Sequence, residues 1–158
     1  MGDKKLIFAF REDKLGMGEV IYCWQPGNRI IAFCGENRVI TLVDKMGKKI
    51  IDFPLKFGGK CKYLEFDSEG DTIAAYQEKC SIVTVINIFS KKTLDLEIDK
   101  NNKDYPTCIR WSKNHPILAI CTNKGYGIQT LLSHNFSPHN KQTNDNFSSL
   151  PQPKHFIF

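Results

Sequence analysis

Hydrophobic positions along the chain fall into short runs separated by turn residues, and three of these runs repeat one pattern. Counting from Trp24, Phe66 and Trp111, an apolar residue followed by alanine recurs seven and eight positions later. These pairs are Ile31-Ala32, Ile73-Ala74 and Leu118-Ala119. The aromatic residues lie 42 and 45 positions apart, which is the repeat length of a four-stranded propeller blade. The pattern predicts an all-β chain built from tandem four-stranded sheets.

The segments between the turns are predicted to be β-strands, because each is short, apolar and bounded by turn residues such as glycine, proline or asparagine. The expected strands of three successive units are 20–24, 30–34, 39–43 and 50–53, then 61–66, 72–76, 81–88 and 94–98, then 107–111 and 117–121. The pattern fades after about Ile128. Leu6–Phe10 is expected to form a further strand ahead of the first unit. No segment has the pattern of a convincing amphipathic helix.

The second strand of each unit is a nearly continuous apolar run: Ile30–Phe33, Ile73–Tyr76 and Ile117–Ile120. Such runs are typical of strands that are covered on both faces, as in blades packed against their neighbours. The recurrent alanine is then the small residue that lets two sheets approach closely. A β-sandwich is the alternative fold, but it gives no reason for an aromatic residue and an apolar-alanine pair to recur in register.

The length of the chain limits how much of a propeller it contains. A blade has about 40 to 45 residues and a ring normally needs at least four blades, so 158 residues cannot close a ring alone. We predict an incomplete WD40-type β-propeller of two blades plus part of a third. Its expected parts are an N-terminal strand and connection at 1–18, blades at 19–134 and a disordered, Asn- and Ser-rich tail at 135–158. The chain would be a fragment, a short isoform or a protein that borrows blades, and its open ends should promote association.

Charge and cysteine content narrow the classes of function. The net charge of +5 comes from scattered lysines without a basic run, which favours solvated turns over a nucleic-acid partner. No stretch approaches the roughly 20 apolar residues of a membrane span and no secretory signal is recognisable, so a cytoplasmic location is expected. No two cysteines form the close pair of a zinc site, so we interpret all of them as reduced packing residues without a metal. They are Cys23, Cys34, Cys61, Cys80, Cys108 and Cys121.

Candidate catalytic residues are sparse. The histidines lie at a turn or in the tail, at His115, His134, His139 and His155. Gly58-Gly59-Lys60 lacks the spaced glycine and the following hydroxyl residue of a phosphate-binding loop, so a turn between blades is the simpler interpretation. The sequence therefore predicts no catalytic, cofactor or metal site, and a non-enzymatic protein.

A succession of short motifs carries a resemblance to a known family. The motifs are Cys23-Trp24-Gln25, Val43 to Lys49, Asp67 to Ala74, Glu78 to Ser81, Trp111-Ser112-Lys113 and Leu118 to Gly125. In this order, from about Leu6 to Gly125, the chain resembles the start of a WD-repeat subunit of intraflagellar transport complex A. The Trp-Asp pair that gives the repeat its name stands here as Val43-Asp44 and Ile86-Asn87. Members of the family continue into further blades and a helical-repeat region, whereas a polar tail follows the third unit here.

The resemblance implies a scaffold that acts in retrograde ciliary transport, cilium assembly and receptor entry, located in the cytoplasm, the cilium and the ciliary base. Its implied partners are other subunits of the complex and tubby-like cargo adaptors. In the family, Leu6–Phe10 would correspond to the strand that completes the final blade. Two alternatives stay open: another cytoplasmic WD-repeat scaffold of the vesicle-coat type, and a WD-repeat protein associated with nucleic acid.

Overall fold

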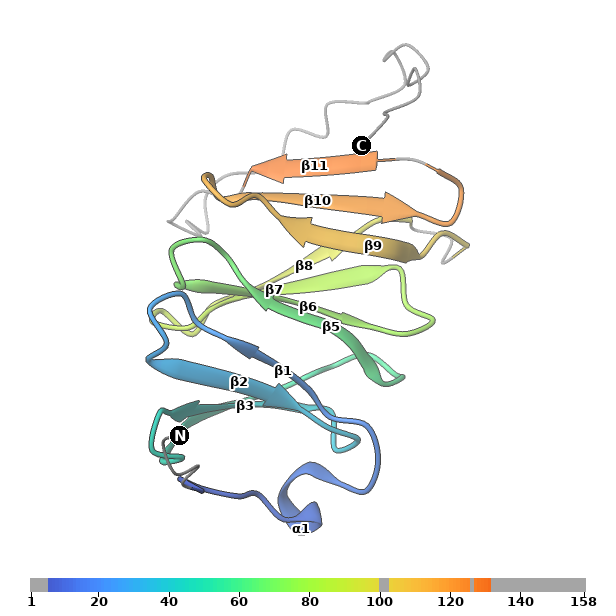
Figure 1. Cartoon of the computed structure of the whole chain (residues 1–158). Helices are drawn as coiled ribbons and strands as arrows, with labels where there is room; N and C mark the ends of the chain where they lie inside the picture. The colour runs from blue at the N-terminus through green and yellow to red at the C-terminus, as the bar shows by residue number, and fades with distance from the viewer. Residues whose placement is uncertain (1–5, 100–102, 126, 132–158) are drawn as a thin grey trace, which may run out of the picture.

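The computed structural model describes residues 6–99, 103–125 and 127–131, and these residues form three antiparallel sheets stacked on one another (Figure 1). The elements, in chain order, are α1 (Glu12–Leu15), β1 (Ile21–Trp24), β2 (Ile30–Cys34), β3 (Val39–Asp44), β4 (Lys49–Pro54), β5 (Cys61–Phe66), β6 (Thr72–Gln77), β7 (Ile82–Asn87), β8 (Thr93–Glu97), β9 (Pro106–Trp111), β10 (Ile117–Thr122) and β11 (Gly127–Leu131). The first blade is β1–β4, the second is β5–β8 and the third is β9–β11. The all-β prediction of an incomplete propeller, with two blades and part of a third, is confirmed.

The same strand register recurs in all three blades. Trp24 pairs with Ile31, Phe66 pairs with Ile73, and Trp111 pairs with Leu118. The first strands β1, β5 and β9 contact one another in succession, as the innermost strands of a propeller do around its centre. The third blade extends through β11, a strand that the fading sequence pattern did not predict.

The two faces of each blade carry different residues, one set facing the preceding blade and the other facing the following blade. Ala32 packs with Ile73 between the first and second blades, and Ala74 packs with Leu118 between the second and third. Because neighbouring residues of a strand point to opposite faces, the alanine of each pair faces the following blade. The apolar residue before it, together with the paired aromatic residue, faces the preceding blade. The core therefore consists of two layers, one between each pair of neighbouring blades.

The expectation that every second strand is covered on both faces is wrong for β10. All six residues of β6 are buried, whereas buried and exposed residues alternate along β10 from Leu118 to Thr122. Ala119 is consequently exposed, although Ala32 and Ala74 are fully buried. Cys108 and Cys121, which pair across β9 and β10, are exposed as well. These two cysteines are not packing residues, because no described blade covers that face.

The predicted strand at Leu6–Phe10 is wrong. These residues form no strand and pair with no sheet. The ring of Phe10 instead packs edge-on against Phe33 of β2, with ring centres 5.4 Å apart, and Phe8 lies 5.5 Å from Phe10. The segment therefore covers part of the free face of the first blade through its aromatic rings.

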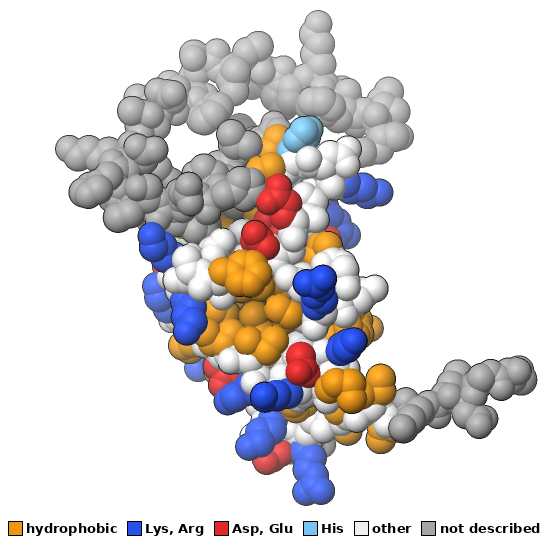
Figure 2. Space-filling model, turned by 90° about the vertical axis from the view of Figure 1, so that its left-hand side faces the viewer, with side chains coloured by type: hydrophobic (Ala, Val, Ile, Leu, Met, Phe, Trp, Pro, Cys, Tyr) orange, Lys and Arg blue, Asp and Glu red, His pale blue; other side chains and the backbone are white. Residues whose placement is uncertain are grey.

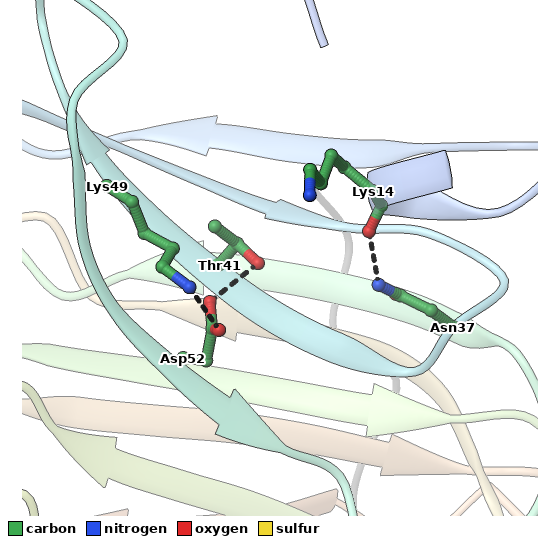
Figure 3. A network of polar contacts seen from close by, with 5 residues as sticks. All are labelled: Lys14, Asn37, Thr41, Lys49 and Asp52. Atoms are coloured by element: carbon green, nitrogen blue, oxygen red, sulfur yellow. Dashed lines mark hydrogen bonds and ion pairs between the residues drawn. The ribbon is translucent and has the colours of Figure 1, made fainter. Parts of the chain in front are cut away.

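The short helix α1 was also missed, and it connects the N-terminal segment to the first blade. The side-chain amide of Asn37 donates a hydrogen bond of 2.6 Å to the carbonyl of Lys14 (Figure 3). The backbone N–H of Asn37 donates to the carbonyl of Leu15 at 3.3 Å. A four-residue helix has too little periodicity to be seen in the sequence, and here it is held by the turn between β2 and β3.

The turn between β5 and β6 depends on one buried carboxylate. Asp67 is 2% exposed, and its Oδ1 accepts hydrogen bonds from the backbone N–H groups of Gly70, Asp71 and Thr72, at 2.7, 3.0 and 3.2 Å. Burial raises the pKa of Asp67 above its usual value, and this effect outweighs the hydrogen bonds that lower it. The hydrogen bonds that close the turn therefore offset only part of the cost of burying the charged carboxylate.

The alanine positions give a direct test of the packing between blades. Ala74→Leu adds volume where the sheets touch and is expected to lower the unfolding free energy by about 1–3 kcal/mol. Ala119→Leu makes the same change at the equivalent exposed position and should alter stability by less than about 0.5 kcal/mol. Urea unfolding followed by circular dichroism measures both variants. Equal losses in the two variants would contradict the assigned faces.

The burial of Asp67 predicts a pH dependence of stability. Because its pKa in the folded chain lies above the reference value of 3.8, the folded state holds the proton more tightly than the unfolded state. The favourable contribution of the protonated form is therefore lost as pH rises through the folded pKa. Relative to Asp67→Asn, the unmodified chain should lose unfolding free energy as the pH rises from 3.8 through the folded pKa of Asp67. Denaturant titrations of both proteins at several pH values measure the difference, and a gain with rising pH would contradict the assigned cause.

Candidate protein-interaction surface

The connections that lead into the blades are fixed in the same way in each repeat. The backbone N–H of Asn37, Glu78 or Asn123, which follows the second strand of its blade, donates to the connection that enters the blade. The acceptors are the carbonyls of Leu15, Lys60 and Tyr105, at 3.3, 2.8 and 3.1 Å. One rim of the stack therefore consists of loops that are held against the turns behind them, which is the usual setting of binding residues on a rigid frame.

The two polar residues at the Trp-Asp positions close turns at the ends of β3 and β7. The Oδ1 atom of Asp44 accepts from the backbone N–H groups of Met46 and Lys48, both at 2.9 Å. The Oδ1 atom of Asn87 accepts from the N–H and the hydroxyl of Ser90, at 2.8 and 2.9 Å. Both side chains are therefore occupied by local hydrogen bonds, which shape the loops without facing a ligand.

Hydrogen bonds between neighbouring blades add to the apolar packing. The side-chain amide of Gln25 donates to the carbonyl of Gly70 at 2.8 Å and links the first blade to the second. The indole N–H of Trp111 donates to the carbonyl of Glu65 at 3.1 Å and links the second blade to the third. The Gln77 amide holds the connection between the first two blades by donating to the carbonyl of Gly59 at 3.0 Å. These bonds fix the blades relative to one another.

A repeated polar pair, which was not predicted from the sequence, links the third and fourth strands of the first two blades. The hydroxyl of Thr41 donates to Oδ1 of Asp52 at 3.0 Å, and the hydroxyl of Thr84 donates to Oδ1 of Asp95 at the same distance. A lysine completes each pair: Lys49 lies 3.0 Å from Oδ2 of Asp52 (Figure 3), and Lys56 lies 3.3 Å from Oδ2 of Asp95. Both residues of the pair recur after 43 positions. This recurrence in the aligned repeats could have revealed the pair from the sequence.

The predicted repeat positions lie in equivalent places but differ in exposure. Phe66 is 5% exposed, because the first blade covers it, and Trp111 is half-buried against the second blade. Trp24 is 47% exposed, since among the described residues only those of the N-terminal segment lie near its face. We call this the first-blade face. It carries Tyr22, Trp24 and Phe33, with Phe8 and Phe10 beside them.

Hydrophobic and basic side chains also meet on the surface. Figure 2 shows hydrophobic side chains gathered on one side of the stack, with lysine and arginine side chains around them. The large hydrophobic residues that are exposed include Trp24, Met46 and Phe89. A mixed surface of this kind on a rigid frame is typical of protein contacts.

The thiols of Cys23 and Cys34 are poor nucleophiles. Burial raises the pKa of Cys23 to about 12, and the hydrogen bond to Cys61 raises the pKa of the Cys34 thiol. Both thiols therefore stay protonated and unreactive at neutral pH. Within the described ranges, no three His, Cys, Asp or Glu side chains gather in a way that could hold a metal ion. His115 is exposed in the turn after β9, and His134, His139 and His155 lie outside the described residues.

Within the described part of the chain, no helix has the length and apolar character that a membrane span requires. The predicted disordered tail at 135–158 lies outside the described residues.

Comparison with known proteins assigns the chain to a family. Residues 20–137 match the family model described as WDR19 first beta-propeller. The WD repeat-containing protein dyf-2 of Caenorhabditis elegans is 30% identical over 115 residues, which are 72% of this chain and 8% of that protein. WD repeat-containing protein 19 is 27% identical in Mus musculus and 28% in Homo sapiens, over 77% of this chain and 9% of theirs. The chain thus spans less than a tenth of the length of these relatives.

A solved structure supports the fold. The β-propeller domain of Cps50 (Swd1) from Myceliophteria thermophila superimposes with a TM-score of 0.61 over 78% of this chain and 42% of that chain. Because the two sequences are 15% identical, this match shows a shared fold and nothing more. Together with the match over 20–137, the stacked blades lead to one conclusion: the chain belongs to the WDR19 first beta-propeller family.

Proposed function

We propose that this chain is a non-enzymatic scaffold, a protein-interaction module of intraflagellar transport complex A that acts in retrograde ciliary transport and cilium assembly. The observation that carries the proposal is the family match over 20–137, which covers all three blades. The recurrent strand register supports it, because it shows that the matched residues form propeller blades.

The physical basis is a rigid frame with variable loops. Hydrogen bonds from Gln25 and Trp111 hold the blades together, and the incoming connections are held against the turns behind them. Contacts made by pre-ordered loops lose little conformational entropy on binding, which favours stable protein assemblies. The proposed partners are other subunits of the complex and tubby-like cargo adaptors, which would couple the chain to receptor entry.

The proposed location is the cytoplasm, with enrichment in the cilium and at the ciliary base. An interaction module needs no catalytic group, and the raised pKa values of the Cys23 and Cys34 thiols agree with a passive role. Asp44 and Asn87 bind their own turns, so the residues that meet partners are proposed to be those of the exposed loops and faces.

Affinity purification from ciliated cells tests the proposal. The tagged 158-residue chain should recover subunits of intraflagellar transport complex A, identified by mass spectrometry, and should concentrate at the ciliary base in fluorescence images. Ala74→Leu disturbs the packing between blades and should reduce recovery. Recovery of vesicle-coat subunits or RNA-associated proteins without ciliary proteins would contradict the proposal.

The first-blade face and the exposed face around Ala119 predict that the purified chain associates. The first-blade face corresponds to the blade faces that pack on a preceding blade, and the face around Ala119 corresponds to those that pack on a following blade. The two faces are therefore complementary, and one copy can bind another through them. Sedimentation velocity at rising concentration should show oligomers. Trp24→Glu and Ala119→Glu each place a charge in such a contact and should shift the chain toward monomer. A monodisperse monomer at high concentration would contradict this prediction.

A further inference from the structure

A pocket of about 750 Å³ lies between the second and third blades, on the rim that carries the incoming connections. Its walls come from the start of β5, the end of β6 with the turn after it, and β9 with the connection that leads into it. The residues that matter for its chemistry are Lys62, Tyr76, Lys79, Lys103, Tyr105 and Arg110. None of the predicted repeat positions lies in this wall.

The charge of the pocket is strongly unbalanced. Four of its residues are lysine or arginine, and Glu78 is the single carboxylate among them. Lys62 is paired with Glu19 at 3.4 Å. No ion pair between described residues involves Lys79, Lys103 or Arg110. The carboxylates nearest these cations are Glu78 in the wall and Asp99, whose Oδ2 accepts the backbone N–H of Lys103 at 2.9 Å. Four lining cations against the one lining carboxylate give the pocket a net positive charge that favours a bound anionic group.

The neighbouring repeat shows that this imbalance is particular to the pocket. Lys79 follows Glu78, whose N–H contacts the incoming connection at Lys60, and Lys124 follows Asn123, whose N–H contacts the connection at Tyr105. Lys124 is paired at 2.5 Å with Asp104, the residue just before Tyr105. The residue just before Lys60 is Gly59, which has no carboxylate. Lys79 thus lacks the acidic partner that its counterpart has.

Part of the remaining wall is apolar. Ile109 and Pro106 are buried, and Tyr76 is 8% exposed. Burial raises the pKa of Tyr76, so its hydroxyl stays neutral and adds no competing negative charge. The N–H of Tyr105 donates to the Asn123 side chain at 2.9 Å, which fixes the connection. A pre-formed pocket with cations at its edge and an apolar wall suits a peptide that carries acidic and apolar side chains.

We propose that this pocket binds an acidic, extended segment of a partner protein, with its carboxylates at Lys79, Lys103 and Arg110. The identity of the partner as a subunit or adaptor of the transport complex rests on the proposed function. The preference of the pocket for an acidic segment is independent of that function. A single-stranded nucleic acid fits less well, because it needs aromatic faces on which bases stack. Of the lining tyrosines, Tyr76 is buried and Tyr63 is half-buried, and Tyr105 alone is largely exposed, at 47%.

Fluorescence anisotropy with the purified 158-residue chain tests the pocket. The probe is a fluorescein-labelled peptide, Glu-Asp-Leu-Glu-Asp-Glu-Leu-Glu, and its control is the same peptide with Gln and Asn in place of the acids. The acidic peptide should bind at about 50 mM salt, and the amide peptide should not. The variant K79E/R110E should weaken binding at least about tenfold. The matched variant K45E/K113E changes the net charge equally at exposed turns outside the pocket and should leave binding unchanged.

The outcomes separate the pocket from its alternatives. Equal weakening by both charge-reversal variants would show nonspecific attraction and overturn the proposal, as would tighter binding of a labelled oligouridylate with the same residue dependence. If circular dichroism shows that K79E/R110E is unfolded, K79Q/R110Q is measured instead and should weaken binding in the same direction. Loss of peptide binding in K79E/R110E with ciliary recovery unchanged would support the pocket and separate it from the complex contacts. Absent peptide binding beside intact ciliary recovery would overturn the pocket alone.

Discussion

Face-to-face packing of sheets is the interaction on which this structure depends. A single blade cannot bury its hydrophobic faces alone, so stability requires neighbouring blades to stack on it. The first and third blades therefore rely on the second, whose β6 is buried along its whole length. Packing at close range needs a small residue opposite a large one, and the repeat supplies this with Ala32 against Ile73 and Ala74 against Leu118. The rims and loops have their positions because these two layers fix the blades.

The sequence was sufficient to predict the blades because strand register is a local property. The spacing of seven residues between Trp24 and Ile31 spans one hairpin, so it determines which residues pair across it. Exposure is not local in this sense. Ala119 has the same sequence context as Ala74 and the same position in its strand, yet it is exposed, because exposure depends on whether another sheet lies against it. The strand predicted at Leu6–Phe10 was wrong for a related reason, since an apolar run does not show whether it joins a sheet edge or covers a sheet face, and here Phe10 lies on the face of the first blade.

The polar features were harder to predict than the apolar ones. Thr41 and Thr84 look like ordinary polar residues within apolar strands, and only their alignment across the repeat shows that each pairs with an aspartate on the next strand. The pocket gave still less warning. Its cations come from segments as far apart as Lys62 and Arg110, which the stacking of two blades brings together. Neither the alternation of residues along a strand nor the repeat of the blades predicts such contacts between distant segments.

The repeat nevertheless makes each blade a reference for the others. Positions that keep their partner in every copy, such as the hydrogen bonds of Asn37, Glu78 and Asn123 to the incoming connections, belong to the frame. Positions where one copy has lost a partner that another copy keeps are free to serve a different purpose. Lys124 keeps Asp104, whereas glycine stands at the matching place near Lys79. An unpaired cation on a rim is no more stable than a paired one, so the frame alone gives no reason for this difference. A negatively charged partner does, because the charge that the chain itself leaves uncompensated is then neutralised on binding.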